Sequence, residues 1–194
     1  MSLFLLFLQC FYYLYLQEFL ITKKKYEKTI FSYHGFDFKH VKNGYEVTLY
    51  INDQQTPHTI SLRSDPRGLE DIPADPLVYH LPKKHQIYAT INPHDNLTGV
   101  TTIAVLELDK IIDNPFLYNI PLNASFTEPY GHGELQVKTC DDATETTAVL
   151  WFRLENETRV YSQNGCLIIA GEKEDDLIRA ADRILYTLLG IMDR

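Results

Sequence analysis

Alternating apolar and polar positions predict β-strands once the first thirty residues have passed. In residues 45–51 most of the apolar side chains fall on every second position, which is typical of a strand with one buried face. Polar residues 52–55 then predict a turn, and residues 58–62 return as the second arm of a hairpin. Several prolines between residues 64 and 82 exclude a long helix in the next stretch.

A strand–helix–strand crossover is predicted in the middle of the chain. Residues 86–91 favour a strand, which a proline-containing turn ends. Thr98 can then cap a helix that stops at Asn114 and the proline after it, and residues 117–126 favour a second strand. Two strands joined in this way pair in parallel with a right-handed connection. The β-branched start of residues 101–108 leaves a strand there as the alternative.

The last third of the chain predicts three short strands and a long helix. The strands are 148–152, 158–161 and 166–170, and the last is apolar throughout, as in a strand buried on both faces. Residues 172–192 have the spacing of an amphipathic helix, with acidic residues at its start, where they favour the helix dipole. The order of elements predicts an α/β domain with a mixed sheet, and α+β is the alternative.

Residues 1–22 form a long hydrophobic segment at the start of the chain. A helix of this length spans about 30 Å, the thickness of a bilayer core. Glu18 and two glutamines oppose a simple span, so an amphipathic or buried helix is the alternative. The lysines within residues 23–28 suit a membrane interface. We expect residues 1–29 to be an anchor helix with a basic stalk and residues 30–194 to be one globular domain.

The amino-acid composition limits the classes of partner that we expect. The net charge of −8 and the pI near 5.3 argue against nucleic acid, because phosphate binding requires clustered Lys and Arg. A domain of about 160 residues buries enough surface to fold without a metal or a dense disulfide network. The expected partners are membrane lipid, through the N-terminal helix, and a protein of the cell envelope.

The signals for orientation across a membrane disagree. Lysines after the hydrophobic segment favour a cytoplasmic domain under the positive-inside rule. Three N-glycosylation sequons, at Asn96, Asn123 and Asn156, favour the outside. The two cysteines of the domain, Cys140 and Cys166, also favour it, since a disulfide between them would stabilise an extracytoplasmic protein by about 3 kcal/mol. Two buried thiols are the alternative.

Residues for catalysis or cofactor binding do not form a known motif. The chain lacks G-x-S-x-G, P-loop, G-x-G-x-x-G and H-E-x-x-H patterns, and no two of its seven histidines share metal-ligand spacing on one predicted element. We therefore expect no metal and no cofactor. Two loops follow the predicted parallel strands, where α/β sheets bind ligands. His94 and Asp95 lie in one, and Glu128 and His132 in the other, so these four residues are the candidates for a site.

Six short segments between Arg63 and Met192 form a recognisable set. They are RSDPR at 63–67 with Ile72-Pro73, IYAT at 87–90 with Asn92-Pro93, ASFT at 124–127, KTCDDA at 138–143, GCLII at 165–169 and LIRAADRILYTLLGIM at 177–192. In them the chain resembles a family of uncharacterised membrane-anchored proteins from small-genome archaea. The resemblance implies an anchored, outward-facing domain with a Cys140–Cys166 bridge and brings no known activity. This chain lacks the basic residues that precede the span in that family.

These observations favour a membrane-anchored, extracytoplasmic domain with a non-enzymatic role in binding or in assembly of the cell envelope. One alternative is an envelope hydrolase or transferase that uses His and carboxylate groups from loops 93–97 and 128–134. A second alternative is a cytoplasm-facing subunit of a membrane complex, for which the lysines of the stalk are the direct support.

Overall fold

Two β-sheets with helices between them form the part of the chain that the structure describes. This computed structural model describes residues 29–50, 57–131, 133 and 135–193. The predicted anchor helix over residues 1–22 lies outside the described residues. Among the helices of the described ranges, none has the length and apolar character that a membrane crossing requires.

A four-stranded antiparallel sheet comes first and is called the meander sheet. Its strands are β1 (Ile30–Tyr33), β2 (Phe36–Val41), β3 (Gly44–Leu49) and β4 (His58–Leu62). Strands β3 and β4 form the predicted hairpin, with Val47 opposite Ile60. Both side chains are buried, while those of the next pair along the strands, Thr48 and Thr59, are exposed. One face of the sheet therefore packs inward and the other meets water.

A six-stranded mixed sheet forms the rest of the fold, in the order β7-β6-β5-β8-β10-β9. The predicted crossover is confirmed: β5 (Gln86–Ile91), α2 (Gly99–Ile112) and β6 (Leu122–Phe126) form a parallel strand–helix–strand unit. The hydroxyl of Thr98 accepts a hydrogen bond from Val100 N–H and caps α2, so the alternative strand at 101–108 is excluded. Strand β6 starts later than residue 117 because the chain first turns, with a left-handed Asn119 (φ 52°).

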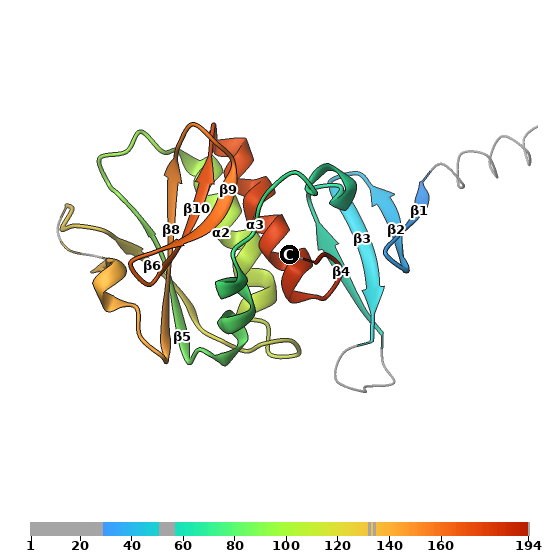
Figure 1. Ribbon diagram of the computed structural model, residues 1–194, viewed down its shortest axis with the longest axis horizontal. Helices are drawn as coiled ribbons and strands as arrows, with labels where there is room; N and C mark the ends of the chain where they lie inside the picture. Colours follow the sequence, from blue (N-terminus) through green and yellow to red (C-terminus); the bar gives the residue numbers. More distant parts are fainter. Residues whose placement is uncertain (1–28, 51–56, 132, 134, 194) are drawn as a thin grey trace, which may run out of the picture.

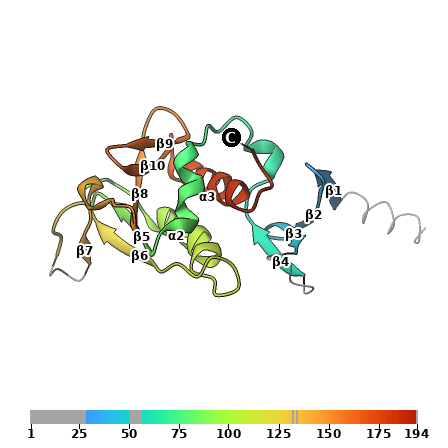
Figure 2. The same cartoon turned by 60° about the horizontal axis from the view of Figure 1, so that its bottom comes forward.

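The remaining strands are β7 (Gln136–Val137), β8 (Thr147–Leu154), β9 (Arg159–Gln163) and β10 (Cys166–Gly171). Strand β10 runs parallel to β8 and is buried along its whole length, as its apolar sequence predicts. Strand β9 folds back antiparallel to β10 and forms one edge of the sheet. Backbone bonds from Val160 to Pro73 and from Asp75 to Val160 cover that edge. Figure 2 shows β7 at the opposite edge, beside β6.

The C-terminal helix α3 (Glu174–Leu188) lies between the two sheets (Figure 1). The predicted amphipathic helix is confirmed, although it spans 174–188 and not 172–192, and polar residues on its second face are buried as well. Asp182 is 0% and Arg183 3% exposed, and the guanidinium of Arg183 donates to the carbonyl of Ile72. The meander sheet covers this second face, and no local pattern in the helix sequence reports that neighbour.

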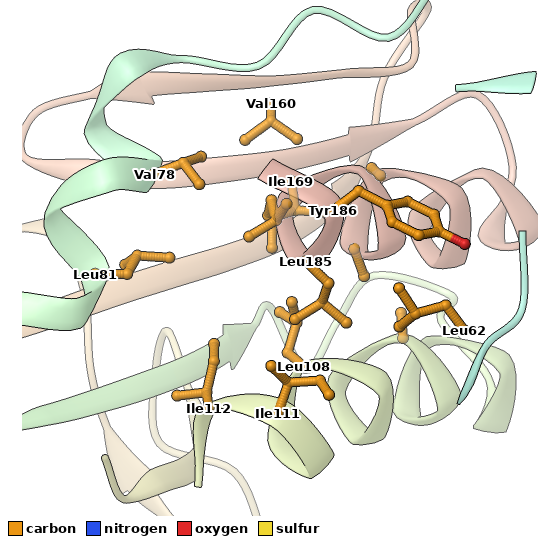
Figure 3. Packing of buried hydrophobic residues seen from close by; sticks show 14 of the residues in the cluster. Leu62, Val78, Leu81, Leu108, Ile111, Ile112, Val160, Ile169, Leu185 and Tyr186 are labelled. Atoms are coloured by element: carbon orange, nitrogen blue, oxygen red, sulfur yellow. The ribbon is translucent and has the colours of Figure 1, made fainter. Parts of the chain in front are cut away.

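One continuous hydrophobic core joins both sheets (Figure 3). Leu108 and Ile112 of α2 pack near Leu185 of α3, and the 3-10 helix Pro76–Lys83 closes the side of this core. Tyr186 extends from α3 toward the meander sheet, where its ring centre lies 5.8 Å from that of Phe38 in an edge-on contact. Such aromatic pairs add about 0.5–1.5 kcal/mol beyond their buried area. The core thus holds the meander sheet and the mixed sheet as one body.

Candidate functional site

Two of the four predicted site residues come together at the carboxyl ends of the parallel strands. His94 follows β5 and Glu128 follows β6, and 3.9 Å separates His94 Nε2 from Glu128 Oε1. The ring of Tyr130 lies edge-on to His94 at 5.9 Å and to Phe126 at 5.6 Å. The parallel pairing of β5 with β6 explains this meeting, since it places both following loops at one edge of the sheet.

The other two predicted residues do not complete a pocket there. Asp95 is exposed, and its backbone carbonyl accepts the Leu97 N–H of the turn. His132 lies outside the described residues. The side chains of His94 and Glu128 are 66% and 49% exposed, and an ion pair in such a setting contributes well under 1 kcal/mol. Catalytic acids and bases are usually shielded from water, so this pair alone gives little support to catalysis.

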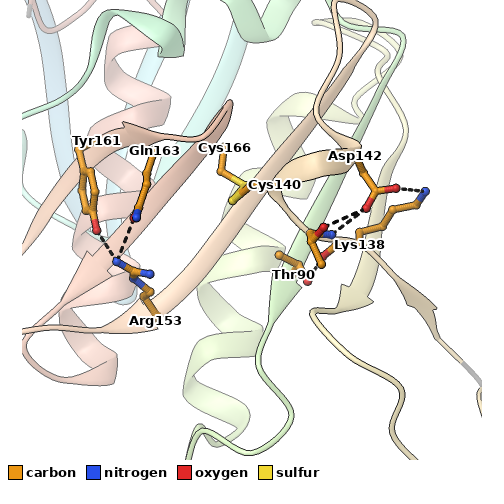
Figure 4. The surroundings of a disulfide bond; sticks show 9 residues. Thr90, Lys138, Cys140, Asp142, Arg153, Tyr161, Gln163 and Cys166 are labelled. Atoms are coloured by element: carbon orange, nitrogen blue, oxygen red, sulfur yellow. Dashed lines mark hydrogen bonds and ion pairs between the residues drawn. A yellow bond between two sulfur atoms is a disulfide. The ribbon is translucent and has the colours of Figure 1, made fainter.

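The predicted disulfide between Cys140 and Cys166 is present, with Cα atoms 5.0 Å apart (Figure 4). It joins the short 3-10 helix Cys140–Asp142 to the first residue of β10. Around it, Val149 and Ile168 form a small apolar cluster on the sheet face that α2 and α3 leave uncovered. The disulfide therefore fastens the segment after β7 across that face.

Hydrogen bonds hold the same segment in place. The hydroxyl of Thr90 on β5 donates to the carbonyl of Lys138 at 3.0 Å. Asp142 accepts from the backbone N–H of Thr139 at 2.9 Å, and this bond lowers the pKa of the Asp142 carboxyl, with a further contribution from the Lys138 ammonium at 3.2 Å. These bonds, together with the disulfide, identify the segment as a structural strap.

Beside the strap, charged and aromatic side chains cover the remaining part of the face. Arg153 donates to the Tyr161 hydroxyl and to Gln163 (Figure 4), and its guanidinium lies 5.0 Å from the ring of Trp151. The Tyr161 hydroxyl donates in turn to Glu155 at 2.6 Å. Burial raises the pKa of Tyr161, and the hydrogen bond to Glu155 raises it further. Hydrogen bonds thus join Arg153, Tyr161 and Glu155 across this part of the face, while the buried Trp151 Nε1 has no partner among the described residues.

The asparagines of all three predicted sequons are exposed; they are Asn96, Asn123 and Asn156. The hydroxyl residue of each sequon has a structural role. Thr98 caps α2, and Ser125 donates to the Ala89 carbonyl on the neighbouring strand at 3.3 Å. Thr158 accepts the backbone N–H of Glu172 at 3.4 Å. The folded protein thus needs these hydroxyls whether or not a glycan is attached.

An apolar pocket of about 610 Å³ opens between the meander sheet, the segment after α2 and the end of α3. It is lined by Phe36, Thr48, Leu49, Tyr50, Leu117, Tyr118, Leu188 and Leu189. The hydroxyl of Tyr118 donates to the carbonyl of Leu188, which ties the segment after α2 to the end of α3. Burial raises the pKa of Tyr118. Tyr50 stands at the rim with 71% of its surface exposed.

Sequence reasoning missed this apolar pocket because its wall comes from three distant parts of the chain. Residues such as Leu117 and Leu188 sit at ordinary apolar positions, and no motif or spacing connects them. The exposed Tyr50 at its rim gives no signal in the sequence either, since single exposed aromatic residues are common on protein surfaces.

A second hollow, about 540 Å³ and polar, lies at the carboxyl ends of β8 and β10. Its lining includes Asp71, Glu157, Glu172, Lys173, Asp176 and Arg179. Arg179 spans it, with bonds to Asp176 at 3.0 Å and to the Gly68 carbonyl at 2.9 Å. Within the described ranges no cluster of His, Cys, Asp and Glu has a geometry that would hold a metal ion. Two of the acidic groups here, Asp176 and Asp71, form ion pairs with Arg179.

The amino end of α2 holds an anion from within the molecule. The Glu174 carboxylate accepts four hydrogen bonds, from the backbone N–H and the hydroxyl of both Thr98 and Thr101, at 2.8–3.1 Å. Burial opposes ionisation of Glu174, but the bonds from Thr98 and Thr101 outweigh it and lower its pKa. In many α/β proteins this position binds phosphate; here a side chain of α3 fills it.

A buried carboxyl lies where the chain passes from the meander sheet to the helices. Asp182 Oδ2 accepts the backbone N–H of Ser64 at 2.7 Å, and no group of the described residues bonds Oδ1. Burial, with a contribution from the nearby Glu107 carboxylate, raises the pKa of Asp182 to about 6, while hydrogen bonding from Ser64 and the charge of Lys110 oppose the change.

No protein-family model, curated protein or solved structure matches this chain. The resemblance to the archaeal membrane-anchored family stays a prediction from sequence. Function is therefore inferred from the pockets and side chains described above.

Proposed function

We propose that this protein is a membrane-tethered, non-enzymatic domain that faces the outside of the cell and binds an apolar group in the apolar pocket. The chemistry of the pocket wall carries this proposal. Five of the eight lining residues are Leu or Phe, and the other three are Thr48, Tyr50 and Tyr118. No carboxylate, imidazole, thiol or cationic group is among them.

A wall of this kind favours binding over chemical conversion. Ligand sites are typically concave, about 300–1,000 Å³, and mostly apolar with a few polar groups, and the apolar pocket fits this description. General acid–base catalysis requires a titratable group within hydrogen-bond reach of the reacting atom. The phenol of Tyr118 is engaged with Leu188, and burial raises its pKa, so it is a poor base at neutral pH.

Two further observations support the tether and the outward orientation. The hydrophobic segment 1–22 has the length of a membrane span and is followed by lysines that suit the headgroup region. The Cys140–Cys166 disulfide favours an oxidising compartment, since cytosolic thiols are kept reduced. A domain tethered there would meet membrane lipid and proteins of the envelope.

Binding of a neutral fluorescent probe, N-phenyl-1-naphthylamine, to the purified full chain in an amphipathic polymer tests the proposal. Leu117→Glu places a carboxylate in the pocket wall, and we expect it to weaken binding at least tenfold, because an unpaired buried charge is costly. The matched control is Leu106→Glu, since Leu106 is 56% exposed on α2 and does not line the pocket. Equal binding by the Leu117 variant and the wild type would overturn the proposal.

The alternative of an envelope hydrolase has one specific observation in its favour, the proximity of His94 and Glu128. It predicts that the full chain turns over a chromogenic ester or glycoside and that His94→Ala abolishes this activity without lowering the melting temperature. Under the binding proposal, His94→Ala and Glu128→Gln leave probe binding unchanged. Turnover that disappears with His94→Ala would replace the binding proposal with the hydrolase.

A further inference from the structure

We propose that the occupant of the apolar pocket is a hydrocarbon chain of a lipid from the membrane in which the protein is anchored. This inference rests on the proposed function and names the ligand class for the same site. Three features support it: the reach of the tether, the mostly apolar side chains of the wall, and an exposed aromatic residue at the rim.

The tether keeps the pocket close to the lipid surface. Residues 23–28 join the hydrophobic segment to Thr29 and span at most about 20 Å when extended. The Thr29 carbonyl accepts the N–H of His40 at 2.6 Å, and Phe36 in the pocket wall lies four residues from His40 along β2, about 13 Å away. The pocket is therefore within about 35 Å of the membrane end of the tether. Lipid is then the apolar ligand at the highest effective concentration.

The wall has few groups with which a polar ligand could pair. The Tyr118 hydroxyl donates its hydrogen to the Leu188 carbonyl, and the Thr48 hydroxyl lies on the exposed face of the meander sheet, where it bonds Thr59 at 3.3 Å. A polypeptide would bring backbone N–H and C=O groups that need partners, and leaving them unpaired is costly. A hydrocarbon chain has no such groups. The wall thus suits a lipid chain better than a peptide segment.

The rim suits the polar end of a lipid. Tyr50 is 71% exposed beside the opening, and tyrosine is enriched where one end of the ring is apolar and the other wet. A headgroup left outside stays hydrated, so no charge has to enter the uncharged pocket. The ligand class is therefore a single-chain or double-chain lipid that inserts one chain and leaves its headgroup in water.

Chain length gives a quantitative test on the full chain in an amphipathic polymer. We expect saturated fatty alcohols of 8 to 14 carbons to displace N-phenyl-1-naphthylamine, with affinity rising about fourfold per added methylene until the pocket is full. Displacement that does not depend on chain length would overturn the lipid inference. Probe binding in the same samples reports on the proposed function separately.

Photo-crosslinking tests the source of the ligand. The full chain is placed in phosphatidylcholine vesicles in which some lipids carry a diazirine at the end of one acyl chain, and the labelled peptides are identified by mass spectrometry. We expect labels on peptides that contain Phe36, Leu117 or Leu188, reduced at least fivefold by Leu117→Glu and unchanged by Leu106→Glu. Labels restricted to residues 1–22 would overturn the lipid inference while the probe result stands.

A second variant distinguishes loss of ligand binding from loss of folding. Leu117 is half-buried in the pocket wall, so Leu117→Trp fills part of the pocket without placing a charge there. It must reduce both fatty-alcohol displacement and lipid labelling if the pocket holds the chain. An apolar peptide that displaces the probe where fatty alcohols fail would assign the pocket to a protein partner. If the probe, the fatty alcohols and the lipid all fail to bind, the proposed function is refuted as well.

Discussion

Replacing Asp182 with asparagine isolates the effect of one buried carboxyl on stability. Burial raises the pKa of Asp182 from its ordinary value of 3.8 to about 6, which corresponds to a penalty of about 3 kcal/mol on its ionised form in the folded protein. The folded protein holds this proton more tightly than the unfolded chain does. The group therefore contributes most to stability below pH 4, and this contribution is lost as the pH rises from about 4 to about 6.

Asparagine cannot ionise, so D182N removes this pH dependence. Its amide oxygen can keep the bond from Ser64, while its NH₂ group takes the place of Oδ1, which lacks a partner among the described residues. The unpaired amide costs about 1–2 kcal/mol at every pH. Between pH 4.5 and pH 8 we expect the stability of D182N to rise relative to the wild type by about 2 kcal/mol.

Urea unfolding of the full chain at pH 4.5 and pH 8, followed by fluorescence, measures the difference. Trp151 is the only tryptophan of the chain and is half-buried in β8, so its emission reports the loss of the mixed sheet. Asp175→Asn, an exposed aspartate of the same helix, is the matched control. A stability difference between wild type and D182N that is the same at both pH values would refute the assignment of a raised pKa to Asp182.

Three other perturbations have defined outcomes. Reduction of the Cys140–Cys166 disulfide lowers the unfolding free energy by about 3 kcal/mol, measured by calorimetry with and without reductant. Glu174→Ala removes four bonds at the amino end of α2 and costs about 1–2 kcal/mol at pH 7; because the pKa of Glu174 is lowered in the fold, this stabilisation fades as the pH falls below about 4.5. Gly44→Ala costs at least about 3 kcal/mol, since Gly44 has φ 148° and a Cβ there lies 2.2 Å from the Leu62 carbonyl oxygen.

Each of the three has a matched control. Reductant leaves a C140S/C166S variant unchanged, and a further loss of stability there would show that the effect is not due to the disulfide. Glu172→Ala, at an exposed position two residues before Glu174, changes stability by less than about 0.5 kcal/mol. Gly99→Ala is equally mild, since a Cβ there meets no atom within 4 Å. A Gly44 variant as stable as the Gly99 variant would contradict the described start of β3.

The local parts of the fold were predictable from the sequence. The turn after residues 86–91 and the helix cap at Thr98 identify the crossover, because the periodicities of strands and helices can be recognised from neighbouring residues. The apolar run 166–170 likewise predicts the buried strand β10, and the hairpin at 45–62 follows from alternation around a polar turn. The disulfide between Cys140 and Cys166 could be predicted because these are the two cysteines of residues 30–194.

The candidate sites were predictable only in part. His94 and Glu128 lie 3.9 Å apart because parallel strands end at the same edge of a sheet, while a functional site there stays a prediction. The apolar pocket was not predictable, since its wall joins residues near position 36 to others near 117 and 188. Such contacts depend on how the meander sheet packs against the helices.

The sequence by itself predicted the hairpin of β3 and β4, the strands of the mixed sheet except β7, the two long helices and the crossover, since each follows from side-chain spacing within a short window. Strands β1, β2 and β7 were not predicted. Only the tertiary structure decided that α3 lies between two sheets, that Asp182 is buried there and that the apolar pocket opens at its end. The physical reason is that burial depends on neighbours from distant parts of the chain. A polar residue such as Asp182 looks solvent-facing in its helix until a second sheet covers it.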